Sequence, residues 1–201
     1  MSIYKFTEVL NDTLSYFLLG DLIALNNYKK AHQLPDNLAK EFTTQETGDR
    51  VVLDGIMIPL SDVANYPYTI IFNLSATPEL LQPGNQLQLR QDGYILKVES
   101  GSIMLYTWWI LNNFTDERVA EKIQYARAHQ LPLIELESGW YHVEILGGQI
   151  LQSSEITNQQ GEKVTLSGLE PAFEFLITKA EIQGNCTADI FRSYRLESEA
   201  Y

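Results

Sequence analysis

The stretch from Gly93 to Leu111 constrains the fold most, because it places two strand-like segments one after the other. In the first segment Tyr94, Leu96 and Val98 lie on one face and charged side chains on the other, which predicts a half-buried strand. The turn contains Gly101, which can adopt positive φ without steric cost. The second segment has no polar face, as is typical of an interior strand. The pattern predicts a β-hairpin at the centre of a sheet.

Two tryptophans fall near the end of this stretch. In a strand, Trp108 and Trp109 would point to opposite faces. Because the whole segment is apolar, we expect both rings to lie in the core rather than to form a binding platform.

The remaining patterns predict a sheet-dominated domain. Strand patterns recur, and helical patterns are bounded by a Thr cap or by a following proline. The expected strands cover residues 14–19, 50–60, 68–74, 86–90, 133–137, 140–146, 149–155 and 172–178, and the expected helices cover 22–33, 36–42 and 116–130. We predict a β-rich α+β fold, an antiparallel two-layer β-sandwich with two or three peripheral helices. It forms a single domain, 1–201, whose last ~10 residues fray.

Charge and composition restrict the partners. The net charge is −12, with 26 acidic and 14 basic residues, which disfavours a nucleic-acid surface and favours a basic protein partner. The alternative is that acidity only keeps the protein soluble. Apolar runs are too short for a membrane span, and the first residues lack a secretory signal. Cys186 is the single cysteine, which fits a reducing compartment, so we expect a cytoplasmic protein.

One segment occurs twice. Tyr28-Lys-Lys-Ala-His-Gln-Leu-Pro35 returns as Tyr125-Ala-Arg-Ala-His-Gln-Leu-Pro132, with six of eight residues identical. Two helices that end alike explain much of this, because His and a following Pro suit a helix C-terminus. The alternative is a duplicated strand–helix–strand unit.

The sequence contains no signature of a known enzyme class. His142 and Glu144 share one face of a predicted strand, a spacing that could hold a metal or a proton-transfer pair if further ligands converged on it. The sequence names no third ligand, so we predict no metal, no cofactor and no catalytic residue. Trp140, on the same face, either contacts a partner or packs under a neighbouring segment.

A second candidate surface lies on the helix after Thr115. Asp116, Glu117 and Glu121 form an acidic patch there. The alternative is that these acids complement the helix dipole and are solvated.

Three segments together resemble a known family. They are Asp49-Arg-Val-Val-Leu-Asp-Gly-Ile-Met-Ile-Pro-Leu60, Asp92-Gly-Tyr-Ile-Leu-Lys-Val-Glu-Ser100 and Glu137-Ser-Gly-Trp-Tyr-His-Val-Glu144. In order and texture, residues 14–146 resemble the competence protein J family, the small bacterial inhibitors of the DNA-entry nuclease. The resemblance implies a cytoplasmic protein that occludes a self-damaging enzyme.

We therefore predict an inhibitor or immunity-type protein that binds a basic enzyme such as a nuclease or toxin. Its predicted contact residues are Trp140, His142, Glu144, Asp116, Glu117 and Glu121. The alternative is a small-ligand or carbohydrate-binding β-sandwich module that uses aromatic residues as a platform. A third possibility is a hydrolase with His142 and Glu144 in its site.

Overall fold

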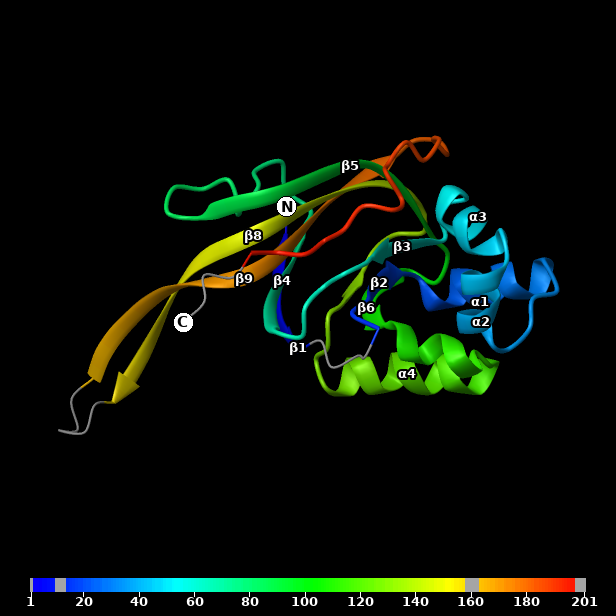
Figure 1. The fold of residues 1–201 in the computed structure, drawn as a ribbon, viewed down its shortest axis with the longest axis horizontal. Helices are drawn as coiled ribbons and strands as arrows, with labels where there is room; N and C mark the ends of the chain where they lie inside the picture. The colour runs from blue at the N-terminus through cyan, green and yellow to red at the C-terminus, as the bar shows by residue number, and fades with distance from the viewer. Residues whose placement is uncertain (1, 10–13, 158–162, 198–201) are drawn as a thin grey trace.

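A computed structural model describes residues 2–9, 14–157 and 163–197 (Figure 1). Its strands are β1 (Ile3–Val9), β2 (Phe17–Gly20), β3 (Met57–Leu60), β4 (Pro67–Asn73), β5 (Gln86–Val98), β6 (Ser102–Thr107), β7 (Leu133–Glu135), β8 (Gly139–Thr157) and β9 (Lys163–Ala180). Its helices are α1 (Leu22–Ala31), α2 (Leu38–Thr44), α3 (Thr47–Leu53), the 3-10 helix η1 (Trp108–Asn113) and α4 (Asp116–Ala128). No helix of the described ranges is long and apolar enough to cross a membrane.

The strands form two sheets, in the orders β1-β4-β9-β8-β5 and β3-β2-β6-β7. The prediction of a β-rich α+β fold is confirmed. The prediction of a wholly antiparallel sandwich is wrong, because β4 and β9 pair in parallel and make the larger sheet mixed. Thr47–Leu53 forms α3, although residues 50–60 were predicted to be a strand, so that segment contains a helix before the short β3.

The predicted central hairpin is also wrong. β5 pairs with β8 at the edge of the larger sheet, whereas β6 pairs with β2 and β7 in the smaller one. The turn between β5 and β6 is therefore a corner at which the chain changes sheets. Gly101 lies in this turn with φ +82°, the positive φ that a glycine at this position allows. The interior position of β6 is confirmed, since Ser102 to Tyr106 are all buried.

The side chain of Asp21 holds this corner in place. Asp21 is 1% exposed and caps α1 by accepting hydrogen bonds from the backbone N–H groups of Ile23 and Ala24. It also accepts from the backbone N–H of Glu99 (2.7 Å) and of Ser100 (2.6 Å), and from the Ser100 hydroxyl (2.9 Å). One carboxylate thus joins the start of a helix to the turn between the sheets.

The main core lies between the two sheets. Phe17 of β2 packs edge-on against Tyr68 of β4 with 5.9 Å between ring centroids, and Tyr68 lies 5.2 Å from Phe173 of β9. These rings are at most 1% exposed. A smaller cluster on the opposite face of the larger sheet contains Ile71, Leu80, Leu146, Ile150 and Ala172.

Two glycines allow β8 to run on without a break. A Cβ at Gly148 would lie 2.1 Å from the carbonyl oxygen of Gln86, and one at Gly147 would lie 2.8 Å from the Leu89 side chain. Only glycine permits β5 to approach this closely. The segments predicted as separate strands, 140–146 and 149–155, are therefore one strand.

The repeated segment forms two matching helix ends. In α1, Leu34 N–H donates to the Lys29 carbonyl (2.9 Å), and in α4 Leu131 N–H donates to the Ala126 carbonyl (3.0 Å). The residue before each leucine is a Gln with φ +54° or +52°. These are Schellman endings, as the capping interpretation requires.

The repeats also occupy equivalent places in the smaller sheet. α1 lies between β2 and β3 in the chain, and α4 lies between β6 and β7. In each case the helix is followed by the edge strand that pairs antiparallel with the strand before it, although α2 and α3 intervene in the first unit.

The C-terminal segment packs along the larger sheet (Figure 1). The Tyr194 hydroxyl donates to the Tyr94 hydroxyl over 3.0 Å, and both rings are 1% exposed. Arg192 donates to the Gln91 side chain (3.1 Å), and Leu196 is buried. Burial raises the pKa of Tyr94 to about 12 and raises that of Tyr194 further.

We expect Asp21→Ala to lower the free energy of unfolding by about 3–5 kcal/mol, because it removes a helix cap and leaves the N–H groups of the corner unpaired. Asn37→Ala is the control. Asn37 caps α2 through one bond to Lys40 N–H (2.9 Å), so its removal should cost about 1 kcal/mol. Urea unfolding measures both. Equal losses in the two variants would show that Asp21 is only a helix cap.

We expect alkaline pH to destabilise the protein through its buried tyrosines. An unfolded tyrosine ionises near pH 10, whereas Tyr94 ionises at about 12 in the folded chain, so stability is complete below about pH 10 and falls as pH rises toward 12. Tyr94→Phe should reduce the loss of stability between pH 10 and 11 by about 1 kcal/mol. Tyr4→Phe, at an exposed position of β1, should leave that loss unchanged. The same slope in all three proteins, measured by urea unfolding, would contradict this.

Candidate functional site

Helix α4 forms one wall of the candidate site. The Thr115 side chain accepts a hydrogen bond from Arg118 N–H (3.3 Å) and caps the helix, as predicted. Val119 and Ala126 are buried on its inner side. Between them, Ile123 also packs against the core, Lys122 is partly exposed, and Glu121 and Tyr125 are exposed to a ligand or partner.

The 3-10 helix η1 forms the opposite wall. The chain leaves β6 at Thr107 and turns into η1, so the predicted strand ends before the two tryptophans. Trp108 is 8% exposed and packs on Tyr16, with 5.1 Å between ring centroids. Trp109 is 68% exposed, so the prediction that it lies in the core is wrong. An interior strand would have buried both tryptophans, because its two faces are covered. η1 lies at the surface instead and exposes the side that carries Trp109.

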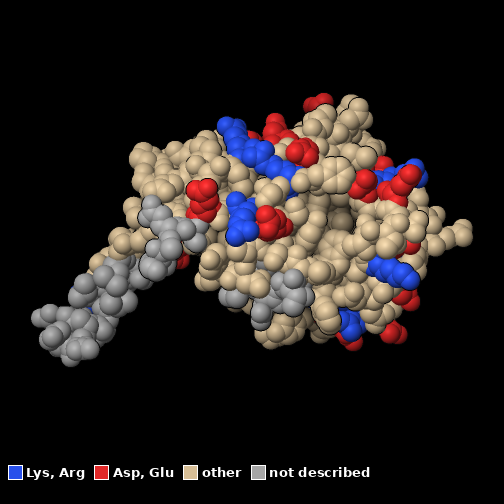
Figure 2. Space-filling view, viewed as in Figure 1, with Lys and Arg blue, Asp and Glu red and all other residues tan. Residues whose placement is uncertain are grey.

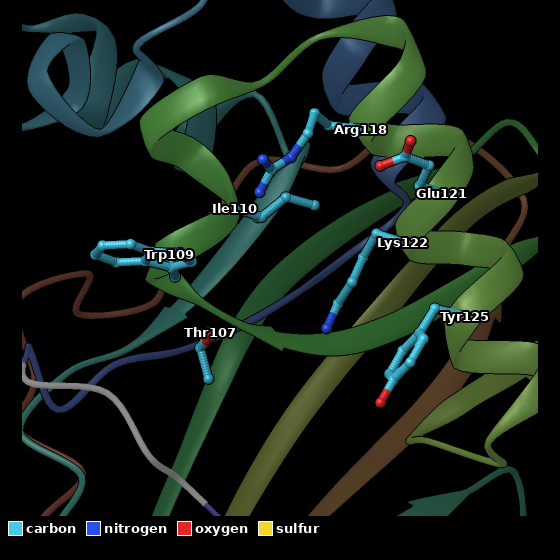
Figure 3. Close-up of a pocket in the computed structure, with 7 residues that line it drawn as sticks. All are labelled: Thr107, Trp109, Ile110, Arg118, Glu121, Lys122 and Tyr125. Atoms are coloured by element: carbon cyan, nitrogen blue, oxygen red, sulfur yellow. The ribbon is translucent and has the colours of Figure 1, made fainter.

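Between these walls lies a cavity of about 370 Å³, which we call the η1–α4 groove (Figure 3). It is lined by Thr107, Trp109, Ile110, Arg118, Glu121, Lys122 and Tyr125. Trp109 and Tyr125 lie on either side of it in Figure 3. The side chain of Arg118 extends from α4 toward Ile110 of η1, whereas that of Lys122 extends toward β6. The groove thus combines aromatic walls with charged groups.

Lys122 is partly buried, whereas the other two charged residues of the groove are exposed. Its side chain also lines a second, smaller hollow of about 200 Å³, together with Glu8 of β1. Burial lowers the pKa of the Lys122 ammonium, and the negative charge of Glu8 offsets this only in part.

The three predicted acids of α4 have different surroundings. The Asp116 carboxylate accepts from the Asn26 side chain (2.6 Å) and pairs with Lys30 (2.7 Å), and the hydrogen bond from Lys30 lowers its pKa. Asp116 therefore fastens α4 to α1. Glu121 lines the groove, whereas Glu117 is exposed and does not line it.

The three predicted residues of β8 lie on the larger sheet and not in the groove. Trp140 is half-buried, with the Lys97 ammonium 5.9 Å from its ring centroid. His142 is exposed, and Glu144 forms an ion pair with Arg90. Their shared outward face is as predicted, because Tyr141 is buried between the first two. Within the described ranges, no cluster of three His, Cys, Asp or Glu side chains is arranged to hold a metal ion.

Sequence reasoning missed Trp109, Lys122 and Tyr125 as site residues. A signal was present in α4, where Arg118, Glu121, Lys122 and Tyr125 recur at spacings of three and four and therefore share one face of a helix. For Trp109 no comparable signal existed, since its exposure depends on where β6 ends.

Comparison with known proteins gives one structural similarity. No protein-family description and no curated protein matches the sequence. Among solved structures, "Crocagin biosynthetic gene J" is similar, with a TM-score of 0.44 and 10% sequence identity over 88% of this chain and 98% of that chain.

The two tryptophans should differ sharply in their effect on stability. Trp108→Ala should lower the free energy of unfolding by about 3–5 kcal/mol, because it leaves a cavity in the core. Trp109→Ala should change it by at most about 0.5 kcal/mol, because the ring is mostly in water. Urea unfolding of both variants is the measurement, and comparable losses would mean that Trp109 is packed into the fold.

Proposed function

We propose that this chain is an acidic binding protein of the inhibitor or immunity type, which occludes a basic enzyme such as a nuclease. The observation that carries the proposal is the η1–α4 groove, whose lining contains an exposed Trp109 together with Tyr125 and Arg118. Trp, Tyr and Arg are the residue types that most often dominate the energy of a protein interface. A 68% exposed tryptophan has no role in the core that would explain its position.

The charge of the molecule supports a basic partner. Figure 2 shows acidic and basic side chains interspersed on the face that it displays, without one acidic patch. The net charge of −12 would therefore act over a distance, by steering a basic protein into encounter. Aromatic contacts in the groove would then hold the complex together.

The predicted contact residues have distinct roles in this proposal. Glu121 in the groove and Glu117 beside it on α4 would contact the partner, whereas Asp116 acts indirectly by fixing α4 to α1. In this proposal, Trp140, His142 and Glu144 of β8 form a second predicted contact surface. Because Glu144 is already paired with Arg90, its charge is less available to a partner than that of Glu121.

The test uses the basic enzyme encoded next to this chain, or one identified by cross-linking in the native host. The purified pair should form a one-to-one complex in which the enzyme is inhibited stoichiometrically. Trp109→Ala should weaken binding at least ~30-fold, about 2 kcal/mol, and His142→Ala should test the β8 surface in parallel. The association rate should fall as salt is raised.

Two results would contradict the proposal. One is that the candidate enzyme keeps full activity when saturated with this chain. The other is a complex whose affinity is unaffected by Trp109→Ala but lost with His142→Ala, which would place the contact on β8.

The same groove favours a second candidate, a module that binds a small ligand such as a carbohydrate. Its cavity of about 370 Å³ is within the range of small-molecule sites, and its aromatic walls suit a ring. A small molecule that copurifies with the chain and no protein partner would favour this second candidate.

A further inference from the structure

Arg118 and Lys122, which line the η1–α4 groove, differ from most other basic residues of this acidic protein in their electrostatic surroundings. Lys5, Lys30, Arg90, Arg127 and Lys179 each form an ion pair with an acidic side chain. Within the described part of the chain, neither the Arg118 guanidinium nor the Lys122 ammonium has an ion-pair partner or a side-chain hydrogen bond. Both line one cavity, one helical turn apart on α4.

This arrangement costs free energy in the absence of a ligand. Like charges four residues apart on a helix repel each other. The Lys122 ammonium is in addition partly removed from water, and neither Glu8 in the adjoining hollow nor Glu121 in the groove restores its pKa to the ordinary value. An anion bound between the two cations would offset both costs.

The charges and walls of the groove define the chemistry of such an anion. Arg118 and Lys122 carry two positive charges and Glu121 one negative charge, so the lining is balanced by a monoanion. A carboxylate has this charge and matches the planar guanidinium, whereas a phosphate monoester carries nearly two charges at neutral pH. Trp109 and Tyr125 supply aromatic rings at opposite sides of the cavity, and Ile110 adds apolar surface to its lining.

We propose that the η1–α4 groove binds a small aromatic carboxylate, with its carboxylate group between Arg118 and Lys122 and its ring against Trp109 and Tyr125. The site is a property of the isolated chain, so it stands or falls independently of the protein partner proposed above. If both proposals hold, such a ligand would compete with that partner for the groove.

The test compares indole-3-acetate with its neutral analogue indole-3-acetamide by calorimetry and by NMR shifts of α4 amides. The acid should bind at least tenfold more tightly than the amide. Lys122→Met and Arg118→Gln should each weaken the acid at least tenfold and leave the amide unchanged. Arg127→Gln, on the same helix but outside the groove, is the matched control and should have no effect.

A further variant separates the ring contact from the charge contact. Trp109→Ala should weaken the acid and the amide by the same factor, because it removes the wall that both probes share. Since Arg118 is exposed, Arg118→Gln should fold even if Lys122→Met does not, and circular dichroism checks both.

Three outcomes would overturn the inference. The wild-type chain could fail to bind indole-3-acetate at about 10 mM. The acid and the amide could bind equally, or the acid could be insensitive to Arg118→Gln. Phenyl phosphate could bind more tightly than indole-3-acetate, which would replace the carboxylate by a dianion.

Discussion

The buried carboxylate of Asp21 is the interaction on which the arrangement of the two sheets depends. The chain passes from the larger sheet to the smaller one at Glu99 to Gly101, a turn whose backbone N–H groups would otherwise lie unpaired at the edge of the core. Asp21 accepts two of these N–H groups and two more from the first turn of α1. Because β2 and β6 flank this point, the same carboxylate fixes the smaller sheet relative to the larger one.

The position of the groove follows from that scaffold through η1 and α4. β6 pairs with β2 and β7, and it ends at Thr107 opposite Phe17, where β2 begins, so the chain turns there. The turn buries Trp108 and leaves Trp109 in solvent. Asp116 then ties α4 to α1, which keeps the facing wall in place. The groove is thus built on anchored elements, as a binding site requires.

Local patterns predicted local structure well and long-range pairing poorly. The Thr115 cap, the matching helix ends before Pro35 and Pro132, and the buried face of Tyr94 to Val98 depend on neighbouring residues, which the sequence shows directly. That β5 and β6 belong to different sheets depends on Asp21, some eighty positions away. The parallel β4–β9 pair, whose partners are about a hundred residues apart, had no local signal.

The central claim is that the outward surface of η1 and α4 is where this chain meets other molecules. Hydrogen exchange of the chain, alone and in complex with its basic partner, tests this most directly. The account predicts slower exchange on binding for the amides between Thr107 and Tyr125, with little change along β8. Protection confined to β8 between Trp140 and Glu144, with η1 and α4 exchanging as in the free chain, would contradict it.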